Sequence, residues 1–331
     1  MISNLTWWTS HLDLLRYLFV WRVHRPAVRF RTPAPADIAC TLGCHIADRL
    51  PSVQAKPWIE ALSFAKSTIF QFDRKSGISL IENPWPLSAA ILVYPVKHFY
   101  GQDELIFWEL KLMGQSADHS LFLEIILPAV ESLSQKSVGL HSNRFSVWGS
   151  FDIQSVYVAK GHHWVPLVDS GKLDLRRRYS TRMWCKDLHF NHRLGLPLKR
   201  LEWMTPVCLP LLPDRKPSQK VTAPQLKHIL DAWLIRASQL ILGRWGTPEK
   251  LIAGMDDDTR RDWLEAIELA RQISVLRAEL VSSPKYGKNM REGAQYFMTP
   301  VPEKLIPYLN LAAIFHVGQF THYGCGTFAL D

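Results

Sequence analysis

The order of strand and helix signals along residues 22–160 restricts the fold more than any other feature of this chain. Residues 22–31 alternate apolar and basic side chains, which predicts a strand, and residues 36–50 carry apolar side chains at four-residue steps, which predicts a helix. We expect further elements in this order: strands 89–96 and 104–112, a helix over 117–134, and strands 145–147 and 151–158. This β-α-β-β-α-β order is typical of a ferredoxin-like domain.

The second half of the chain repeats the order. The predicted elements are a strand over 198–211, helices over 222–242 and 262–279, a short apolar segment at 296–300, a core helix over 305–315, and a last strand. A length of 331 residues suits two domains of ordinary size. The predicted fold class is therefore α+β, with two tandem ferredoxin-like domains at 1–165 and 198–331, joined by a basic linker at 166–197.

The first 26 residues leave two interpretations open. Leu12, Leu15, Leu18 and Phe19 have helical spacing, so this segment is either a short amphipathic helix or the beginning of the first strand. It lacks the basic start and small-residue end of a signal peptide, and no uninterrupted apolar stretch reaches the roughly 18 residues of a membrane span. We therefore expect no membrane partner.

The cysteines argue against a metal site and against a disulfide framework. Their number is five, which is odd, and no pair has CxxC spacing. Cys40 and Cys44 lie near His45, but nothing downstream completes a ligand set, and the pair His162 and His163 also has no third ligand at metal spacing. We expect no cofactor and no metal, and a reducing, cytoplasmic location.

The formal net charge of +9 favours a polyanionic partner, because Lys and Arg attract phosphates at long range. A basic protein without a nucleic-acid role fits the charge equally well. The densest basic patch consists of Arg176, Arg177, Arg178 and Arg182. Such patches bind phosphate without reading base sequence.

The C-terminal segment is the most informative motif. Gly318, Gly324 and Gly326 space a loop that also holds His322 and Tyr323. Glycines permit positive φ and a close approach to a ligand, and N–H groups exposed in such a loop suit phosphate oxygens. A dinucleotide-binding loop is excluded, since it would open a helix early in a βαβ unit. The alternative is a glycine-rich turn into an edge strand.

This closing stretch, IPYLNLAAIFHVGQFTHYGCGTFALD, resembles the C-terminal glycine-rich motif of the CRISPR repeat-processing endoribonucleases of the RAMP superfamily. In that family an apolar helix leads into a G-x-(several)-G-x-G loop and a final strand. Residues 35–50, 101–158 and 201–240 are similar at the level of pattern. The resemblance covers most of the chain and implies two RAMP domains, which are RRM-like, with a C-terminal glycine-rich loop that packs near the first helix.

The resemblance also implies metal-independent cleavage, in which a 2′-hydroxyl attacks the adjacent phosphate and leaves a 2′,3′-cyclic phosphate. This reaction requires a base, an acid and positive charge at the phosphate. His45 is the leading candidate for acid or base, because the family often keeps a catalytic histidine on its first helix and imidazole transfers protons near neutral pH. His322 and Tyr323 are second choices. His45 is alternatively a partly buried or capping residue.

The expected partners are CRISPR repeat RNA or the mature guide RNA, with other CRISPR effector subunits as further partners. The residues expected to contact RNA are Arg29, Arg31, Arg176, Arg177, Arg178, Arg182, Lys285, Lys288, Arg291, Gly318, Gly324 and Gly326. Solvated loops and a protected edge strand explain the basic residues without RNA. A non-catalytic RAMP subunit that holds guide RNA would share the fold and the loop, so it is the alternative to the endoribonuclease.

Overall fold

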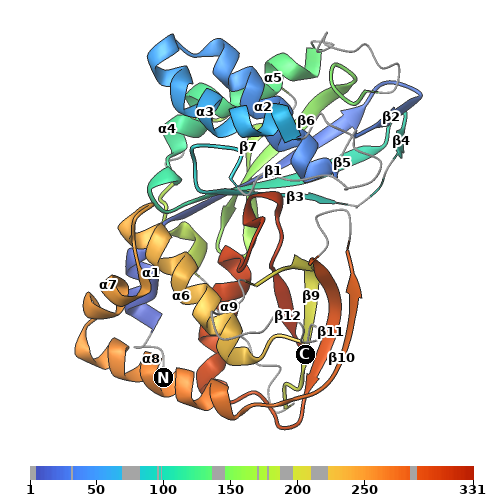
Figure 1. Cartoon of the computed structure of the whole chain (residues 1–331). Helices are drawn as coiled ribbons and strands as arrows, with labels where there is room; N and C mark the ends of the chain where they lie inside the picture. The colour runs from blue at the N-terminus through green and yellow to red at the C-terminus, as the bar shows by residue number, and fades with distance from the viewer. Residues whose placement is uncertain are drawn as a thin grey trace. The chain divides into compact units, whose positions relative to one another are not determined.

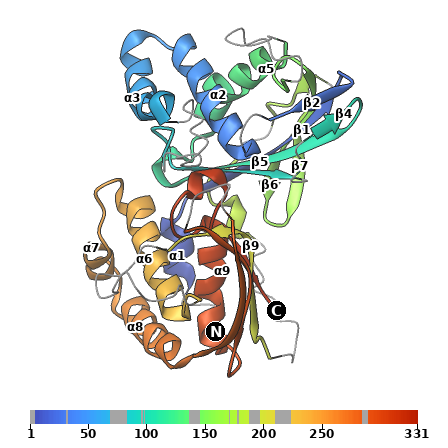
Figure 2. The same cartoon turned by 45° about the vertical axis from the view of Figure 1, so that its right-hand side comes forward.

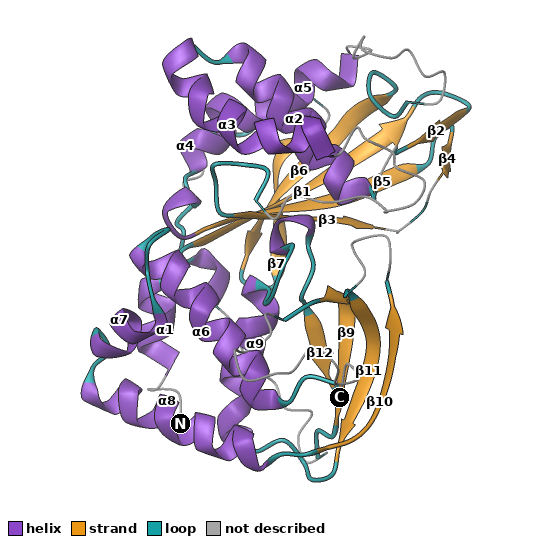
Figure 3. Cartoon of the chain, viewed as in Figure 1, coloured by secondary structure: helices purple, strands orange, loops and turns teal. Residues whose placement is uncertain are grey.

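The structure, a computed structural model, describes residues 5–30, 33–68, 83–94, 97, 99–135, 146–169, 171–176, 179–186, 197–209, 223–283 and 289–331. The chain divides into two compact units. Asp13–Leu188 form the first, called the central unit; Met1–Leu12 together with His189–Asp331 form the second, called the terminal unit because it holds both chain ends. Each unit has a mixed α/β structure with antiparallel strands (Figures 1 and 3).

The central unit contains a six-stranded sheet in the order β3-β5-β1-β6-β7-β8. Its strands are β1 (Leu14–Val23), β3 (Ala89–Tyr94), β5 (Leu105–Met113), β6 (Phe151–Lys160), β7 (His163–Asp169) and β8 (Lys172–Leu173), and a separate pair joins β2 (Ala27–Arg29) to β4 (Phe99–Gly101). The first strand begins at Leu14 and not at residue 22 as predicted. The reason is that Tyr17, Phe19 and Trp21 alternate along β1 and are fully buried on one face.

Helices cover one face of this sheet (Figure 2). They are α2 (Ala34–Arg49), α3 (Ser52–Thr68), α4 (His119–Leu121), a π-helical turn η3 (Phe122–Ile126) and α5 (Leu127–Gln135). Helix α2 agrees with the prediction, since Leu42 and Ile46 are buried at the expected spacing. The sequence analysis placed no helix between residues 50 and 89, but α3 forms there and buries Ala55, Trp58 and Leu62 at helical spacing.

Stacked aromatic rings fill the layer between this sheet and its helices. Phe19 stacks on Trp108 with centroids 4.1 Å apart, and Tyr17 stacks on Phe122 at 3.6 Å. Trp108 is also fully buried. The many aromatic residues of this unit are therefore core residues first, and only those that remain exposed are available to stack on a base.

The terminal unit contains a four-stranded antiparallel sheet in the order β10-β11-β9-β12. Its strands are β9 (Arg200–Val207), β10 (Val275–Ser282), β11 (Arg291–Phe297) and β12 (Phe328–Leu330), and its helices are α1 (Thr6–His11), α6 (Leu226–Leu242), α7 (Pro248–Ala253), α8 (Asp257–Gln272) and α9 (Ile306–Phe315). The helices lie on one face of the sheet (Figure 2). The predicted helix over 262–279 is wrong in its last part, because α8 ends at Gln272 and β10 follows.

The N-terminal helix belongs to the terminal unit although the chain then enters the central unit. Trp8, which is fully buried, lies 5.8 Å from Trp233, 5.7 Å from Trp263 and 6.2 Å from Tyr308 between ring centroids. This aromatic cluster explains why residues 1–12, predicted in the first domain, group with the second half. Residues 163–173, predicted mostly as linker, instead pair with β6 as β7 and β8.

None of the helices in the described ranges combines the length and the apolar character that crossing a membrane requires.

Candidate functional site

His45 lies in the penultimate turn of α2 in the central unit. Its side chain is half-buried, between buried Ile46 and exposed Asp48. It therefore lies at the border of the buried face of α2, as its place beside the apolar stripe in the sequence predicts. The Nε2 atom of the ring is buried, so only the remaining part of the imidazole reaches the surface in this conformation.

Two tryptophans hold α2 in place. Trp85 Nε1 donates to the carbonyl oxygen of Ala39 at 2.7 Å, and Trp148 Nε1 donates to Asp37 Oδ1 at 3.0 Å. Gly43 makes the first contact feasible, since a Cβ at this position would lie 2.8 Å from Trp85 Nε1. Buried hydrogen bonds of this kind fix the orientation of a helix, so the backbone of His45 is positioned by the core.

A second imidazole of the central unit escaped the sequence analysis. His119 Nδ1 lies 2.8 Å from Tyr17 Oη, and the ring of Tyr179 lies edge-on at 5.1 Å. Burial lowers the pKa of His119, and the Asp118 carboxylate opposes this shift. Residues 17 and 119 come together only because the sheet and α4 meet, and no local pattern in the sequence indicates that contact.

A charged cluster on β1 and β5 was also missed. Arg16 Nε donates to Glu109 Oε1 at 2.5 Å, and Lys111 lies opposite Arg16 in the strand register. Burial lowers the pKa of Lys111 to about 8, and the nearby Glu109 carboxylate opposes this shift. The guanidinium of Arg16 also lies 5.1 Å from the centre of the Trp164 ring. The two-residue spacing of Glu109 and Lys111, which puts both on one face of a strand, is the signal that could have found this cluster.

The predicted RNA-contacting arginines of the central unit are on its surface where the structure describes them. Arg29 and Arg182 are exposed, and so is Arg176, whose Nε donates to Asp174 Oδ1 at 2.8 Å. The adjacent carboxylate raises the pKa of Arg176 and partly neutralises its charge toward a ligand. Arg31, Arg177 and Arg178 lie outside the described residues.

In the terminal unit, the glycine-rich loop runs from the end of α9 to β12 and packs against the end of β9. Gly318 has φ 89°, and a Cβ there would lie 2.4 Å from the carbonyl oxygen of Cys208; Gly326 has φ 83°, and its Cβ would lie 1.9 Å from that of Val317. Both positions therefore exclude any side chain. Here the glycines serve close packing of main chain on main chain.

Many main-chain N–H groups of this loop bond within the unit. Gln319 N–H donates to Cys208 O at 2.8 Å, and Gly326 N–H donates to Pro206 O at 2.9 Å. Gly324 N–H closes a turn onto Thr321 O at 3.0 Å. Residues 318–320 are partly exposed, whereas residues 321–326 are buried. If the loop binds phosphate, its partly exposed tip is the part that does so.

The two loop candidates for catalysis are inside the protein. His322 is 1% exposed and Tyr323 is 2% exposed. The pKa of His322 falls to about 3, because burial disfavours the charged imidazole and the Arg236 guanidinium repels it. His322 is therefore neutral at pH 7. In this conformation it is not placed to exchange protons with a bound RNA.

The candidates divide between the units. His45, Arg29, Arg176 and Arg182 belong to the central unit, and the loop glycines with His322, Tyr323 and Arg291 belong to the terminal unit. Arg291, the first residue of β11, is half-buried. Lys285 and Lys288 lie outside the described residues.

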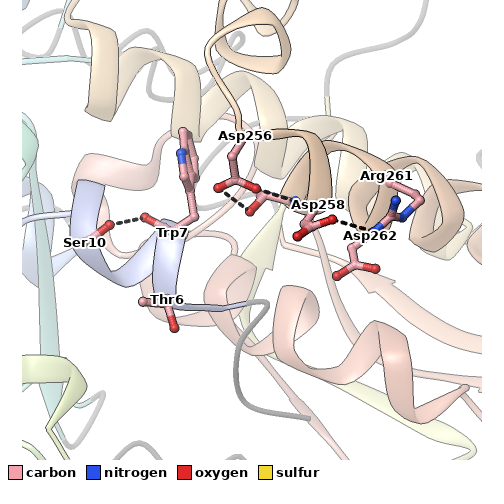
Figure 4. Close-up of a pocket in the computed structure, with 8 residues that line it drawn as sticks. Thr6, Trp7, Ser10, Asp256, Asp258, Arg261 and Asp262 are labelled. Carbon is pink, nitrogen blue, oxygen red and sulfur yellow. Dashed lines mark hydrogen bonds and ion pairs between the residues drawn. The ribbon is translucent and has the colours of Figure 1, made fainter.

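A pocket of about 650 Å³ opens in the terminal unit between α1 and the start of α8 (Figure 4). Its walls hold Trp7 and the carboxylates of Asp256, Asp258 and Asp262. Asp256 is engaged as the N-cap of α8, since its Oδ1 accepts from Thr259 N at 2.7 Å. The three carboxylates outnumber the one guanidinium of the lining, that of Arg261, so the charge of the pocket disfavours a phosphate backbone. Across the described ranges no group of three or more His, Cys, Asp or Glu residues could hold a metal ion.

No protein-family model matches the sequence, and no curated protein matches it significantly. Solved structures do match the fold. A chain of a "Partial Cas6-RT-Cas1--Cas2 complex" superposes with a TM-score of 0.52 and 14% identity, over 97% of this chain and 46% of that one. A chain of the "Cas6-RT-Cas1--Cas2 complex" gives the same TM-score and identity, over 97% of this chain and 29% of that one.

A "Cas6 (TTHB231) product complex" has a TM-score of 0.47 and 13% identity, with 96% of this chain and 100% of that chain covered. The chain spans less than half the length of the first two matched chains. The two matches with a TM-score of 0.52 are chains of complexes whose names include Cas6, so the resemblance inferred from the sequence is confirmed at the level of the fold.

Proposed function

We propose that this protein binds CRISPR repeat RNA and cleaves it without a metal ion, as a repeat-processing endoribonuclease. The observation that carries the proposal is a fold shared over 97% of this chain with a chain of a complex whose name includes Cas6. The exposed arginines of the central unit support it, because they suit a phosphate backbone, and within the glycine-rich loop only the partly exposed residues 318–320 are placed to add to this.

The strand orders support a tandem ferredoxin-like architecture. The central unit has the spatial order β3-β5-β1-β6, and the terminal unit has the order β10-β11-β9-β12. If the four strands of each unit are numbered 1 to 4 along the chain, both orders read 2-3-1-4. All neighbours are antiparallel. Helices on one face of each sheet complete the pattern.

Within this proposal His45 acts as the general base or the general acid of the cleavage reaction. The RNA supplies its own nucleophile, the 2′-hydroxyl, so the protein has to remove that proton, protonate the leaving 5′-oxygen and stabilise the charge on phosphorus. An imidazole on a rigid helix at the edge of the buried face suits either proton transfer once RNA binding gives access to a ring nitrogen, since Nε2 is buried in this conformation. The exposed arginines Arg29 and Arg182 suit the phosphates, and the partly exposed loop tip around Gly318 suits a sugar or phosphate in close approach.

The remaining predicted contacts rest on the sequence alone. Arg31, Arg177, Arg178, Lys285 and Lys288 stay predictions, as do RNA contacts by Gly324 and Gly326, whose surroundings are buried. Binding to other CRISPR proteins is part of the proposal, since the matched chains belong to complexes whose names include Cas1 and Cas2.

A single-turnover assay with excess purified protein, repeat RNA and EDTA tests the activity. We expect one cut, with a 2′,3′-cyclic phosphate on the upstream fragment, and no cut in an RNA of scrambled sequence. Products that carry a 3′-hydroxyl would contradict the proposed chemistry.

The alternative is a non-catalytic RAMP subunit that holds guide RNA. The burial of His322 and Tyr323 favours it, because these two candidates of the loop are withdrawn from any ligand in this conformation. Tight RNA binding without cleavage at any pH between 5 and 9 would establish the alternative.

A further inference from the structure

Strand β10 is an open edge of the terminal unit. Among the strands that the structure describes, it has a neighbour on one side only, β11 (Figure 1). An edge strand carries a row of N–H and C=O groups that point away from the sheet and can pair with another chain. Among the described strands β10 is also unusually bare, since none of its eight residues is buried.

The exposed side chains of β10 include large apolar ones. Leu276 is 63% exposed and Val281 is 59% exposed. Arg277 and Glu279 have side-chain exposures of 62% and 57%. A strand that packs on helices normally buries every second residue, so the pattern shows that the helices of this unit do not cover either face of β10.

The sequence of β10 is symmetric about its centre. Residues 275–281 read VLRAELV, which is the same in both directions except that Arg277 and Glu279 exchange places across Ala278. An antiparallel pair of identical strands related by a twofold axis at Ala278 therefore places Arg277 opposite Glu279 of the second copy, twice. It also places leucine opposite leucine and valine opposite valine. Cross-strand pairs of opposite charge and of β-branched residues stabilise such a sheet.

We propose that β10 pairs with β10 of a second copy of this chain, so that two four-stranded sheets join into one eight-stranded antiparallel sheet. The occupant is another copy because the charge pattern complements itself only in this arrangement. A shift of two residues in either direction places Arg277 opposite Arg277 or Glu279 opposite Glu279, and like charges directly opposite one another destabilise the pair. The two charges therefore select a single register.

The neighbouring strand favours this geometry at Arg277. The guanidinium of Arg277 lies 4.2 Å from the centre of the Tyr296 ring on β11 and 3.6 Å from Glu279 on its own strand. These contacts keep the guanidinium of Arg277 on the face of the sheet where the Glu279 carboxylate of the second copy would lie. The register shift between Val275 and Arg277 makes Leu276 the extra residue of a bulge, so regular pairing is centred on residues 277–279 and the leucines and valines flank it.

The expected dimer is weak. A pair of eight-residue strands buries less than the roughly 1,200 Å² of a stable interface, so we expect a dissociation constant in the micromolar range, below about 100 μM. This association does not depend on RNA or on the proposed activity.

Sedimentation equilibrium of the full chain, with charge reversals, tests the proposal. Arg277→Glu or Glu279→Arg alone should weaken the dimer at least about tenfold, because each places like charges opposite in both symmetric pairs. The double variant R277E/E279R restores opposite charges and should dimerise as the wild type does. The matched control is the exchange R271E/E268R on α8, another exposed pair of the same unit; it should leave the dimer unchanged.

A cysteine at the symmetry axis gives a second readout. With oxidised glutathione as the oxidant, Ala278→Cys should form a disulfide with the same position of a second copy, because directly opposite residues have Cβ atoms about 4.5–5.5 Å apart and a small backbone shift brings them within disulfide reach. Glu268→Cys, at another exposed position of the same unit, measures the background from random collision and from the native cysteines. A wild type that is monomeric at 100 μM, single reversals without effect on a dimer, or A278C cross-linking no faster than E268C would each overturn the proposal.

Discussion

The last turns of α2 and the glycine-rich loop were both singled out as places for a catalytic histidine, but the two histidines differ in burial. His45 lies half-buried at the edge of the buried face of a helix that two tryptophans hold in place. His322 is 1% exposed, and its pKa is about 3. A histidine in a conspicuous motif is therefore not by itself a proton-transfer group; its surroundings decide whether it can gain a proton at working pH.

The largest effect on the cleavage rate is expected when His45 is replaced. His45→Ala should lower the single-turnover cleavage rate by about 10²–10⁴-fold, the usual contribution of a general acid or base, with RNA affinity kept. His162→Ala, at an exposed histidine of the same unit, is the matched control and should cleave as the wild type does. Equal rates for the two variants would remove His45 from the mechanism.

The glycine positions of the loop are expected to act mainly through folding. Gly326→Ala should destabilise the chain by about 3 kcal/mol or more, because the added Cβ would overlap a carbonyl oxygen as well as require positive φ. Gly171→Ala has a similar φ of 74° with no atom within 4 Å, so it should cost only about 1 kcal/mol. Thermal unfolding measures both. A Gly326→Ala variant as stable as Gly171→Ala would show that the close approach is absent.

Replacing His322 should change the pH dependence of the free energy of unfolding and leave the cleavage rate unchanged. In the unfolded chain its imidazole binds a proton below pH about 6.5, whereas in the folded chain it does so only near pH 3. The free energy of unfolding therefore falls as the pH falls through this window, by up to about 1.4 kcal/mol per pH unit from this group. His322→Gln should flatten the slope measured by urea unfolding at pH 7.0, 5.5 and 4.5. An unchanged slope, together with lost cleavage, would reverse the roles given to the two histidines.

The smallest effects are expected at the basic surface. Arg182→Ala should weaken RNA binding a few-fold and lower the slope of log affinity against log salt by about 1. Arg176→Ala should have a smaller effect, because Asp174 already pairs with that guanidinium. Filter binding at several salt concentrations compares them. A larger loss for Arg176→Ala would mean that RNA displaces Asp174.

Local sequence patterns predicted most of the elements around these sites. The α2 helix follows from the spacing of its buried side chains, whereas the strands β3 and β5 and the helix α9 follow from continuous apolar sequence, since β3 and β5 bury residues on both faces. Helix α3 was missed because Pro57 and a run of polar residues hide the helical spacing of its buried side chains. Strand β10 was taken for helix because its leucines continue the apolar spacing of α8.

Tertiary contacts were beyond the sequence. Nothing near Trp8 indicates that it joins Trp233 and Trp263, more than 200 residues further along the chain. The pair of Tyr17 and His119, 102 residues apart, is hidden for the same reason. The sequence motif singled out His322 as a candidate, but it could not indicate the pKa of this histidine. That pKa is set by burial, and the burial depends on how the loop folds onto β9.

The claim that the RNA supplies its own nucleophile has the most direct test. The measurement compares single-turnover cleavage, in EDTA, of repeat RNA and of the same RNA with one 2′-deoxynucleotide at the cleavage site. The account predicts that the protein binds both equally and cuts only the first, leaving a cyclic phosphate. Cleavage of the deoxy-substituted RNA at the same position, or binding of both with no cleavage of either, would contradict it.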